Sequence, residues 1–120
     1  MPAFRFILVV LFSVLLMPAG ALAHAILLQS QPAASSSVSV GKLDMTFRYN
    51  SRIDRARSRL TLIRPDRHES VLKIVPSGSP DTLQTSVELT SPGAYVVRWQ
   101  VLAVDGHITR GDVPFTVTDH

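Results

Sequence analysis

The 120-residue sequence contains no cysteine. Disulfide bonds, thiolate metal sites and catalytic thiols are therefore excluded. Small exported domains are often held together by disulfides. A domain without them has to be stabilised by packing and, where one binds, by a metal ion. The sequence also shows no nucleophile–base pair and no paired carboxylates of the kind that indicate hydrolytic chemistry.

The one long hydrophobic run lies at the N-terminus. Residues 6–17 are apolar apart from Ser13, follow Arg5, and precede Pro18, Gly20 and the small-residue sequence Ala21-Leu22-Ala23. This order is typical of a secretory signal peptide, whereas a membrane-spanning helix needs about 20 apolar residues. We therefore expect residues 1–23 to be a Sec signal peptide cleaved after Ala23, and residues 24–120 to be one exported domain. Without Arg5 that domain keeps 11 basic against 9 acidic side chains, a balance that indicates no particular partner.

The exported part alternates between short apolar runs and turn residues. Seven runs are predicted to be strands: residues 25–29, 42–49, 60–63, 71–75, 83–89, 94–104 and 107–118. The polar segment 32–37 is predicted to be a turn, and Pro114, which lacks an amide hydrogen, is expected at an edge or a bulge. Short strands with frequent turn signals predict an all-β, seven-stranded antiparallel Greek-key β-sandwich.

The run 94–104 leads to a candidate pair of metal ligands. Tyr95, Val97, Trp99 and Val101 alternate onto one face, which predicts a core strand with Trp99 buried. The run then meets Asp105-Gly106-His107. Residues two apart on a strand project to the same side, so Asp105 and His107 can lie side by side. On its own this motif is better explained by an Asp-Gly turn followed by an incidental histidine.

His24 would be the first residue of the processed chain. Cleavage after Ala23 gives it a free α-amine, which together with its imidazole Nδ1 can chelate one metal ion. An ordinary α-amine has a pKa of about 7.7–8.0, so a strongly binding metal can displace its proton at neutral pH. Nitrogen and oxygen donors in a tetragonal arrangement suit copper(II). We therefore predict a copper(II) site formed by His24 and His107, with Asp105 supplying an oxygen or orienting a ring.

With these motifs the sequence resembles the CopC family of periplasmic copper-resistance proteins. The resemblance rests on His24-Ala25, Pro32-Ala33-Ala34, Leu43-Asp44-Met45-Thr46-Phe47, the run from Pro92 to Trp99, Val104-Asp105-Gly106-His107, and Gly111 with Phe115-Thr116-Val117. It implies a cupredoxin-like or immunoglobulin-like sandwich in the periplasm. It also implies that copper(II) is held by the amine and ring of His24, by the His107 ring and by Asp105. The implied role is a monomeric copper carrier or buffer in resistance or import, with a CopD-like inner-membrane protein as its partner.

The sequence departs from parts of that family in two places. Some members carry a glutamate near the copper(II) soon after the Thr-Phe pair, where Arg48-Tyr49-Asn50 stands here, and the alternation places Tyr49 in the core. Other members have a methionine-rich loop that binds copper(I). Met1 and Met17 lie in the predicted signal peptide, so Met45 is the only methionine left in the exported domain. One thioether cannot make a soft-ligand copper(I) site, and the chain therefore resembles the copper(II)-only type.

Two other functions stay open at this point. An N-terminal histidine and a second histidine also hold copper in lytic polysaccharide monooxygenases, although residues 24–120 leave little room for the broad substrate surface of such an enzyme. The sandwich could also serve protein contacts alone, without a metal. We expect a binding protein rather than an enzyme.

The remaining histidines and the arginines have simpler explanations. His68 lies in a polar segment between two strands and is expected in a solvated loop, and His120 is the last residue of the sequence. Arginine is concentrated at Arg48, Arg52, Arg55, Arg57, Arg59, Arg64 and Arg67. Such charge protects strand edges, or it can bind anionic lipid or an acidic membrane partner. Nucleic acid is not expected as a ligand, because no aromatic residues are interleaved with the basic ones.

Overall fold

The computed structural model describes residues 24–120, so the predicted signal peptide lies outside the described residues. The described part contains eight strands and one short 3-10 turn. They are β1 (Leu27–Gln31), β2 (Ser36–Ser39), β3 (Gly41–Tyr49), η2 (Arg55–Arg57), β4 (Arg59–Ile63), β5 (Glu69–Leu72), β6 (Thr82–Leu89), β7 (Gly93–Leu102) and β8 (Ile108–Thr118). No helix in this part of the chain is long and apolar enough to cross a membrane.

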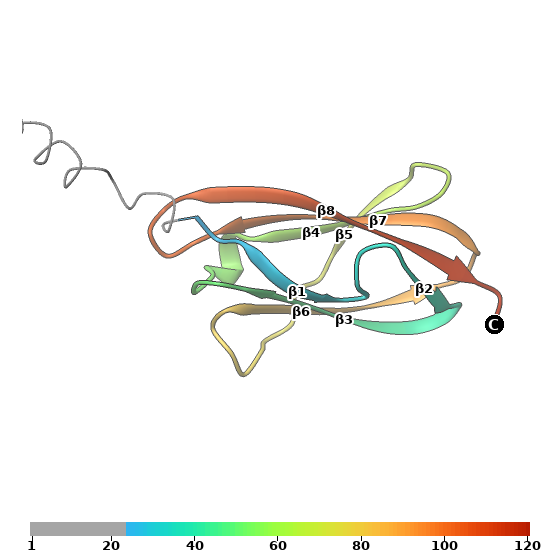
Figure 1. The fold of residues 1–120 in the computed structure, drawn as a ribbon, viewed down its shortest axis with the longest axis horizontal. Coiled ribbons are helices and arrows are strands. Elements are labelled where there is room, and N and C mark those ends of the chain that lie inside the picture. Colours follow the sequence, from blue (N-terminus) through green and yellow to red (C-terminus); the bar gives the residue numbers. More distant parts are fainter. Residues whose placement is uncertain (1–23) are drawn as a thin grey trace, which may run out of the picture.

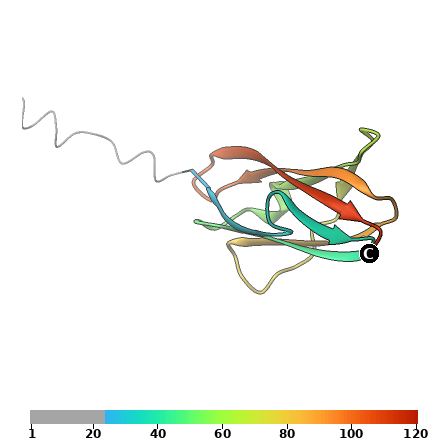
Figure 2. The same ribbon diagram turned by 45° about the vertical axis from the view of Figure 1, so that its right-hand side comes forward.

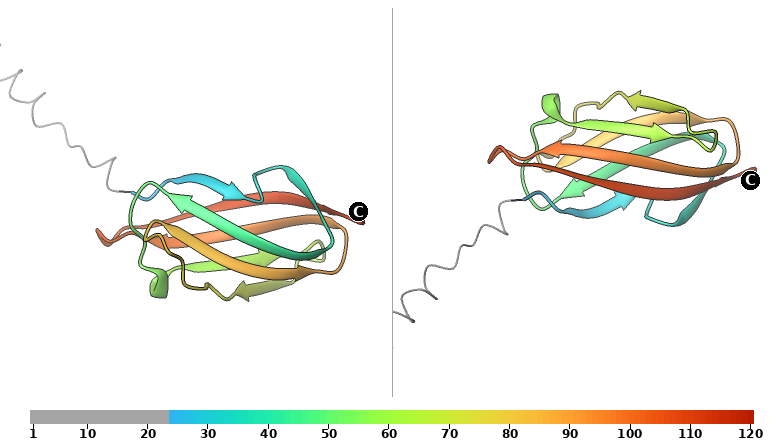
Figure 3. Two further views of the ribbon diagram at one scale, coloured as in Figure 1. Left: turned by 90° about the horizontal axis from the view of Figure 1, so that it is seen from below. Right: turned by 90° about the horizontal axis from the view of Figure 1, so that it is seen from above.

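The strands form two sheets that face each other as a sandwich (Figure 1). One sheet has the order β1-β3-β6 and the other the order β2-β8-β7-β4-β5. Figure 3 shows the long β7 and β8 hairpin running the length of the larger sheet. The predicted all-β sandwich is confirmed.

The structure has one strand more than predicted, because β2 lies half in the predicted turn 32–37 and half in a stretch for which no element is predicted. Its sequence is Ser-Ser-Val-Ser, with a single apolar residue, so no alternation of side chains indicates a strand. It is a strand because its backbone pairs with residues 115–118 of β8. This pairing is parallel, so the prediction of a purely antiparallel sandwich also needs correction. Pro114 lies one residue before the paired stretch, where β8 is still a sheet edge on that side and needs no amide donor.

The core lies between the sheets and follows the predicted alternation. Tyr95, Val97, Trp99 and Val101 of β7 are at most 7% exposed. The Tyr95 hydroxyl donates a 2.6 Å hydrogen bond to the Ser91 carbonyl, four residues upstream. This contact resembles the tyrosine corner of immunoglobulin-like sandwiches and fixes the turn that enters β7.

Trp99 is buried against a position that only glycine can fill. Gly111 of β8 lies opposite Trp99 in the sheet register. A Cβ atom at Gly111 would lie 2.6 Å from Cε2 and 2.9 Å from Nε1 of the indole, so the ring or a strand would have to move. We expect Gly111→Ala to lower the free energy of unfolding by about 1–3 kcal/mol, measured by chemical denaturation. Gly78→Ala is the matched control, because nothing lies within 4 Å of its Cβ position. Equal stability of the two variants would contradict this packing.

Candidate metal centre

The turn between β7 and β8 carries two of the predicted ligands. It is closed by hydrogen bonds from Ala103 N to His107 O and from Gly106 N to Ala103 O, both 2.9 Å long. Gly106 has a φ of 91°, a conformation that glycine adopts most readily. The Asp-Gly turn is therefore real, and the same turn brings Asp105 back to His107.

Asp105 binds both the backbone and the ring of His107. One carboxylate oxygen accepts the His107 amide at 3.1 Å, and the other lies 3.2 Å from the imidazole Nδ1. When Nδ1–H donates to a carboxylate, the Nε2 lone pair is left free for a metal. The His107 side chain is 54% exposed, so Nε2 is within reach of solvent and ions.

The same contacts stabilise the charged form of Asp105. The backbone N–H of His107 is the main cause that lowers the pKa of this carboxyl below its ordinary value, and the imidazoles of His107 and His24 add to it. Partial desolvation acts in the opposite direction. Asp105 therefore remains an anion at neutral pH and favours positive charge beside it.

His24 lies directly against His107. The two ring centroids are 5.0 Å apart and the ring planes meet at 73°. A metal ion about 2 Å from one nitrogen of each ring would leave the centroids roughly 4–6 Å apart, so the observed spacing suits two imidazoles that share one ion. Residues 24 and 107 are 83 positions apart in the sequence, and only the fold brings them together.

Three hydrogen bonds hold the chain just after His24. The Ala25 carbonyl accepts from the Thr109 hydroxyl at 2.9 Å, and Ala25 is only 2% exposed. The Ile26 amide donates to Asn50 Oδ1 at 2.7 Å, and the Asn50 amide donates to the Ile26 carbonyl at 3.0 Å. These contacts place the start of the described chain beside the β7–β8 turn (Figure 2). Asn50 and Thr109 were not predicted, because no local motif distinguishes them from other polar residues.

The side chains alone do not complete a metal site. Within residues 24–120, no group of three or more histidine, aspartate or glutamate side chains is arranged to hold a metal ion. The two imidazoles offer two nitrogen donors, and the Asp105 carboxylate is already hydrogen-bonded to His107. A metal ion held here would therefore need a further donor. The main-chain nitrogen of His24 is covalently close to that residue's own ring, and it becomes a basic amine if the chain is cut before it.

Tyr49 lies in the core, as its alternation predicts. It is 1% exposed and packs edge to face on Trp99, with the ring centroids 5.3 Å apart. Its hydroxyl is buried without a hydrogen-bond partner in the described residues. Burial raises the pKa of this phenol, so it stays protonated and neutral at physiological pH.

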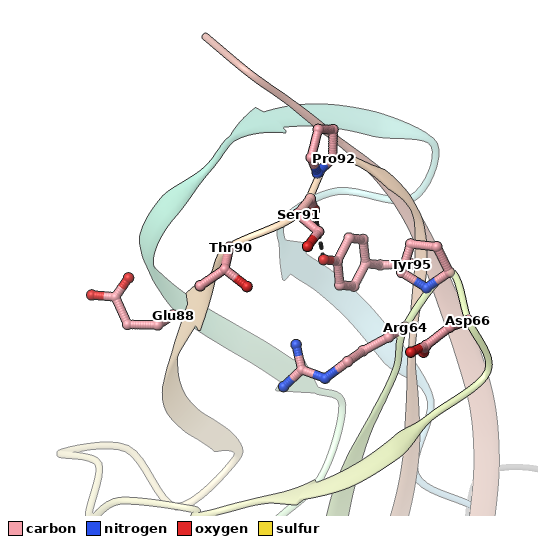
Figure 4. A pocket seen from close by; sticks show the side chains of 8 residues that line it. Arg64, Asp66, Glu88, Thr90, Ser91, Pro92 and Tyr95 are labelled. Carbon is pink, nitrogen blue, oxygen red and sulfur yellow. Dashed lines mark hydrogen bonds between the residues drawn. The ribbon is translucent and has the colours of Figure 1, made fainter.

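A hollow lies at the end of the sandwich opposite the candidate centre. It has a volume of about 450 Å³ and is formed by the turns before β5 and before β7 (Figure 4). Arg64, Asp66, Glu88 and Thr90 line it, and the Tyr95–Ser91 hydrogen bond closes one wall. His68 belongs to the same turn as Arg64 and Asp66, since its amide binds Asp66 Oδ1 and its carbonyl accepts from the Arg64 amide. His68 is therefore far from the candidate centre.

Comparison with known proteins decides the family. Residues 27–118 match the CopC domain. This chain belongs to the CopC family. It is 31% identical to the Escherichia coli K12 protein YobA over 118 residues, which cover 94% of this chain and 93% of that protein.

Solved structures of CopC proteins share the fold. The crystal structure of CopC from Methylosinus trichosporium OB3b matches with a TM-score of 0.72 and 25% identity, covering 78% of this chain and 93% of that one. PcoC, a methionine-rich copper resistance protein from Escherichia coli, matches with a TM-score of 0.65 and 24% identity, covering 80% of this chain and all of that one. CopC proteins are periplasmic copper-binding proteins of copper resistance and act as carriers, not as enzymes. The monooxygenase alternative is therefore set aside.

Proposed function

We propose that this chain, once cleaved after Ala23, carries a single copper(II) ion bound by His24 and His107 at the end of the sandwich. The observation that carries the proposal is the 5.0 Å contact between the two imidazole rings. Asn50 and Thr109 bind the two residues after His24 and fix the contact from one side. Asp105 holds the His107 ring on the other side of this contact.

Each residue has a distinct role in this site. His24 supplies its α-amine and Nδ1 as a chelate, and His107 supplies Nε2. Asp105 uses one oxygen on the His107 amide and the other on the His107 ring, so its role is to hold that ring in place and to balance the charge of the ion. Partners of this kind, which orient a ligand without binding the metal, are common around metal-bound histidines.

The exposure of the site suits a carrier. His24 and His107 are both exposed at the tip of the molecule, so a recipient's ligands can reach a bound ion without unfolding the domain. A carrier needs such access, whereas a structural metal is enclosed by its ligands. We propose that the carrier acts as a monomer and exchanges copper with a CopD-like protein of the inner membrane.

The proposed oxidation state of the bound copper follows from the types of donor that the described residues offer. Met45 is the only methionine of the described residues, and it is 1% exposed in the core. Nitrogen and carboxylate donors suit copper(II), while copper(I) prefers thioethers and thiolates. We therefore expect the processed chain to bind one copper(II) tightly and to compete poorly for copper(I) against a chelating probe. Tight copper(I) binding in that competition would show that a soft site exists.

The anchors of the N-terminal segment provide a test that leaves every ligand in place. Thr109→Val keeps the side-chain shape but leaves the Ala25 carbonyl without its hydroxyl donor. We expect copper(II) affinity to fall by about tenfold, within the range typical of outer-shell partners. Thr109→Ser keeps the hydroxyl and should restore the affinity. A Thr109→Val chain that binds copper(II) like the parent would show that this anchor does not position His24.

A further inference from the structure

Most of the exposed large apolar side chains lie close to one of the two histidines in the sequence. Among residues 24–120, five large hydrophobic side chains are exposed: Ile26 (53%), Leu28 (54%), Val71 (69%), Val104 (67%) and Ile108 (52%). Single exposed hydrophobic residues are ordinary and need no explanation. Four of these five, however, lie within four residues of His24 or His107 in the sequence. We call Ile26, Leu28, Val104 and Ile108 the apolar collar.

The fold keeps the parts of the collar together. Ile108 begins β8 directly after His107, and Val104 lies in the turn that ends at His107. Ile26 is two residues from His24, and the Thr109 contact with Ala25 joins its segment to β8. Figures 1 and 2 both show this segment beside the β7–β8 turn. The fifth exposed residue, Val71, is on β5 at the far edge of the larger sheet.

The excess positive charge of the domain lies at the same end. The Arg52 carbonyl accepts from the Val104 amide, η2 carries Arg55 and Arg57, and Arg59 and Arg110 flank Gln100 in the register of the larger sheet. The aspartates of this end are Asp54, Asp81 and Asp105. This end thus carries five arginines against three aspartates. The remaining six basic and six acidic side chains of residues 24–120 balance. A bound copper(II) ion would add to the excess.

We infer that the apolar collar and these arginines form a docking surface for a partner protein whose own surface is apolar at the centre and acidic around it. This rests on the proposed function, and it specifies the recipient or donor with which His24 and His107 exchange copper. A partner that covers the collar also covers the metal centre, so its ligands meet the ion as the apolar surfaces pack. Charge complementarity speeds the encounter, and burial of the collar supplies the affinity.

A membrane surface and a second copy of the chain fit less well. Proteins that bind at a lipid interface typically anchor with tryptophan, tyrosine or phenylalanine, and none of the five exposed hydrophobic residues is aromatic. Lipid would also cover the centre without offering copper ligands. Two copies that met through this end would bring five arginines toward five arginines, which like-charge repulsion opposes.

The experiment places a photo-reactive phenylalanine analogue at Val104, or at Val71 as the matched control, in cells of the organism that encodes the chain. We expect one protein adduct at Val104 that is absent at Val71. The adduct is identified by mass spectrometry and the protein is purified. Its binding is then compared for the parent, Val104→Ser/Ile108→Ser, Arg52→Glu and Val71→Ser, with and without copper.

The surface predicts a specific pattern of affinities. The collar double variant should bind about tenfold more weakly or worse, as expected when residues at the centre of an interface are truncated. Arg52→Glu should weaken binding more at low salt than at high salt, and Val71→Ser should match the parent. An adduct to lipid, to a second copy only, equal adducts at Val71, or no adduct at Val104 would overturn the inference. Copper(II) titration of the same variants separates the two proposals, since docking variants that retain parental copper affinity test the surface alone.

Discussion

A chain that keeps one extra residue before His24 is expected to lose most of its copper(II) affinity. In such a chain the nitrogen of His24 is an amide, which binds a metal only after it loses its proton, so the chelate of a free His24 amine with its imidazole is gone. The loss should exceed the roughly 10–100-fold that removal of an outer-shell partner costs. Competition titration against a copper(II) chelator compares the chain that begins at His24 with one that begins Met-His24.

The extended chain also supplies its own control. A protease site that ends before His24 allows the same protein sample to be measured before and after the extension is removed, and removal should restore the affinity. Thermal unfolding of both metal-free forms should agree, because His24 is exposed and adds no side chain to the core. If the extended chain bound copper(II) as tightly as the processed one, the amine would not be a ligand.

Replacement of His107 is expected to have the second largest effect. His107→Ala removes a nitrogen donor and leaves copper(II) on the His24 chelate alone. Asp105→Asn keeps a group of the same shape that can still accept the His107 amide, but it removes the negative charge beside the ring. We therefore expect His107→Ala to weaken binding clearly more than Asp105→Asn, for which the loss should be about 10–100-fold.

The control for this comparison is a variant of a histidine that lies far from the metal centre. His68→Ala changes the turn between β4 and β5 and should leave copper(II) affinity unchanged. All three variants should unfold like the parent when metal-free, since none removes a core side chain. A His107→Ala chain with parental affinity would move the site elsewhere, to His68 or His120.

Much of the fold was predictable because the core strands alternate cleanly. The face of Tyr95, Val97, Trp99 and Val101 is buried as expected, and Tyr49 joins it. β2 was missed because a serine-rich strand has no side-chain pattern, and its only signal is backbone pairing with β8. Local patterns predict strands whose side chains enter a core, and they do not reveal a strand held by its main chain.

The candidate centre, too, was predictable from the sequence only in part. His24 and the Asp105-Gly106-His107 motif could be selected from the sequence because their donor chemistry is specific. Asn50 and Thr109 could not, because an asparagine and a threonine acquire a positioning role only when the fold brings residues 25 and 26 against them. The apolar collar is likewise invisible in the sequence, where exposed and buried isoleucine look alike.

The central claim is that one copper(II) ion is shared by His24 and His107. Its most direct test is electron paramagnetic resonance of the one-to-one copper(II) complex of the chain that begins at His24. We expect a tetragonal spectrum with hyperfine structure from three nitrogen atoms, and we expect one of those nitrogens to be lost in His107→Ala. A spectrum with oxygen ligands alone, or one that His107→Ala leaves unchanged, would contradict the account.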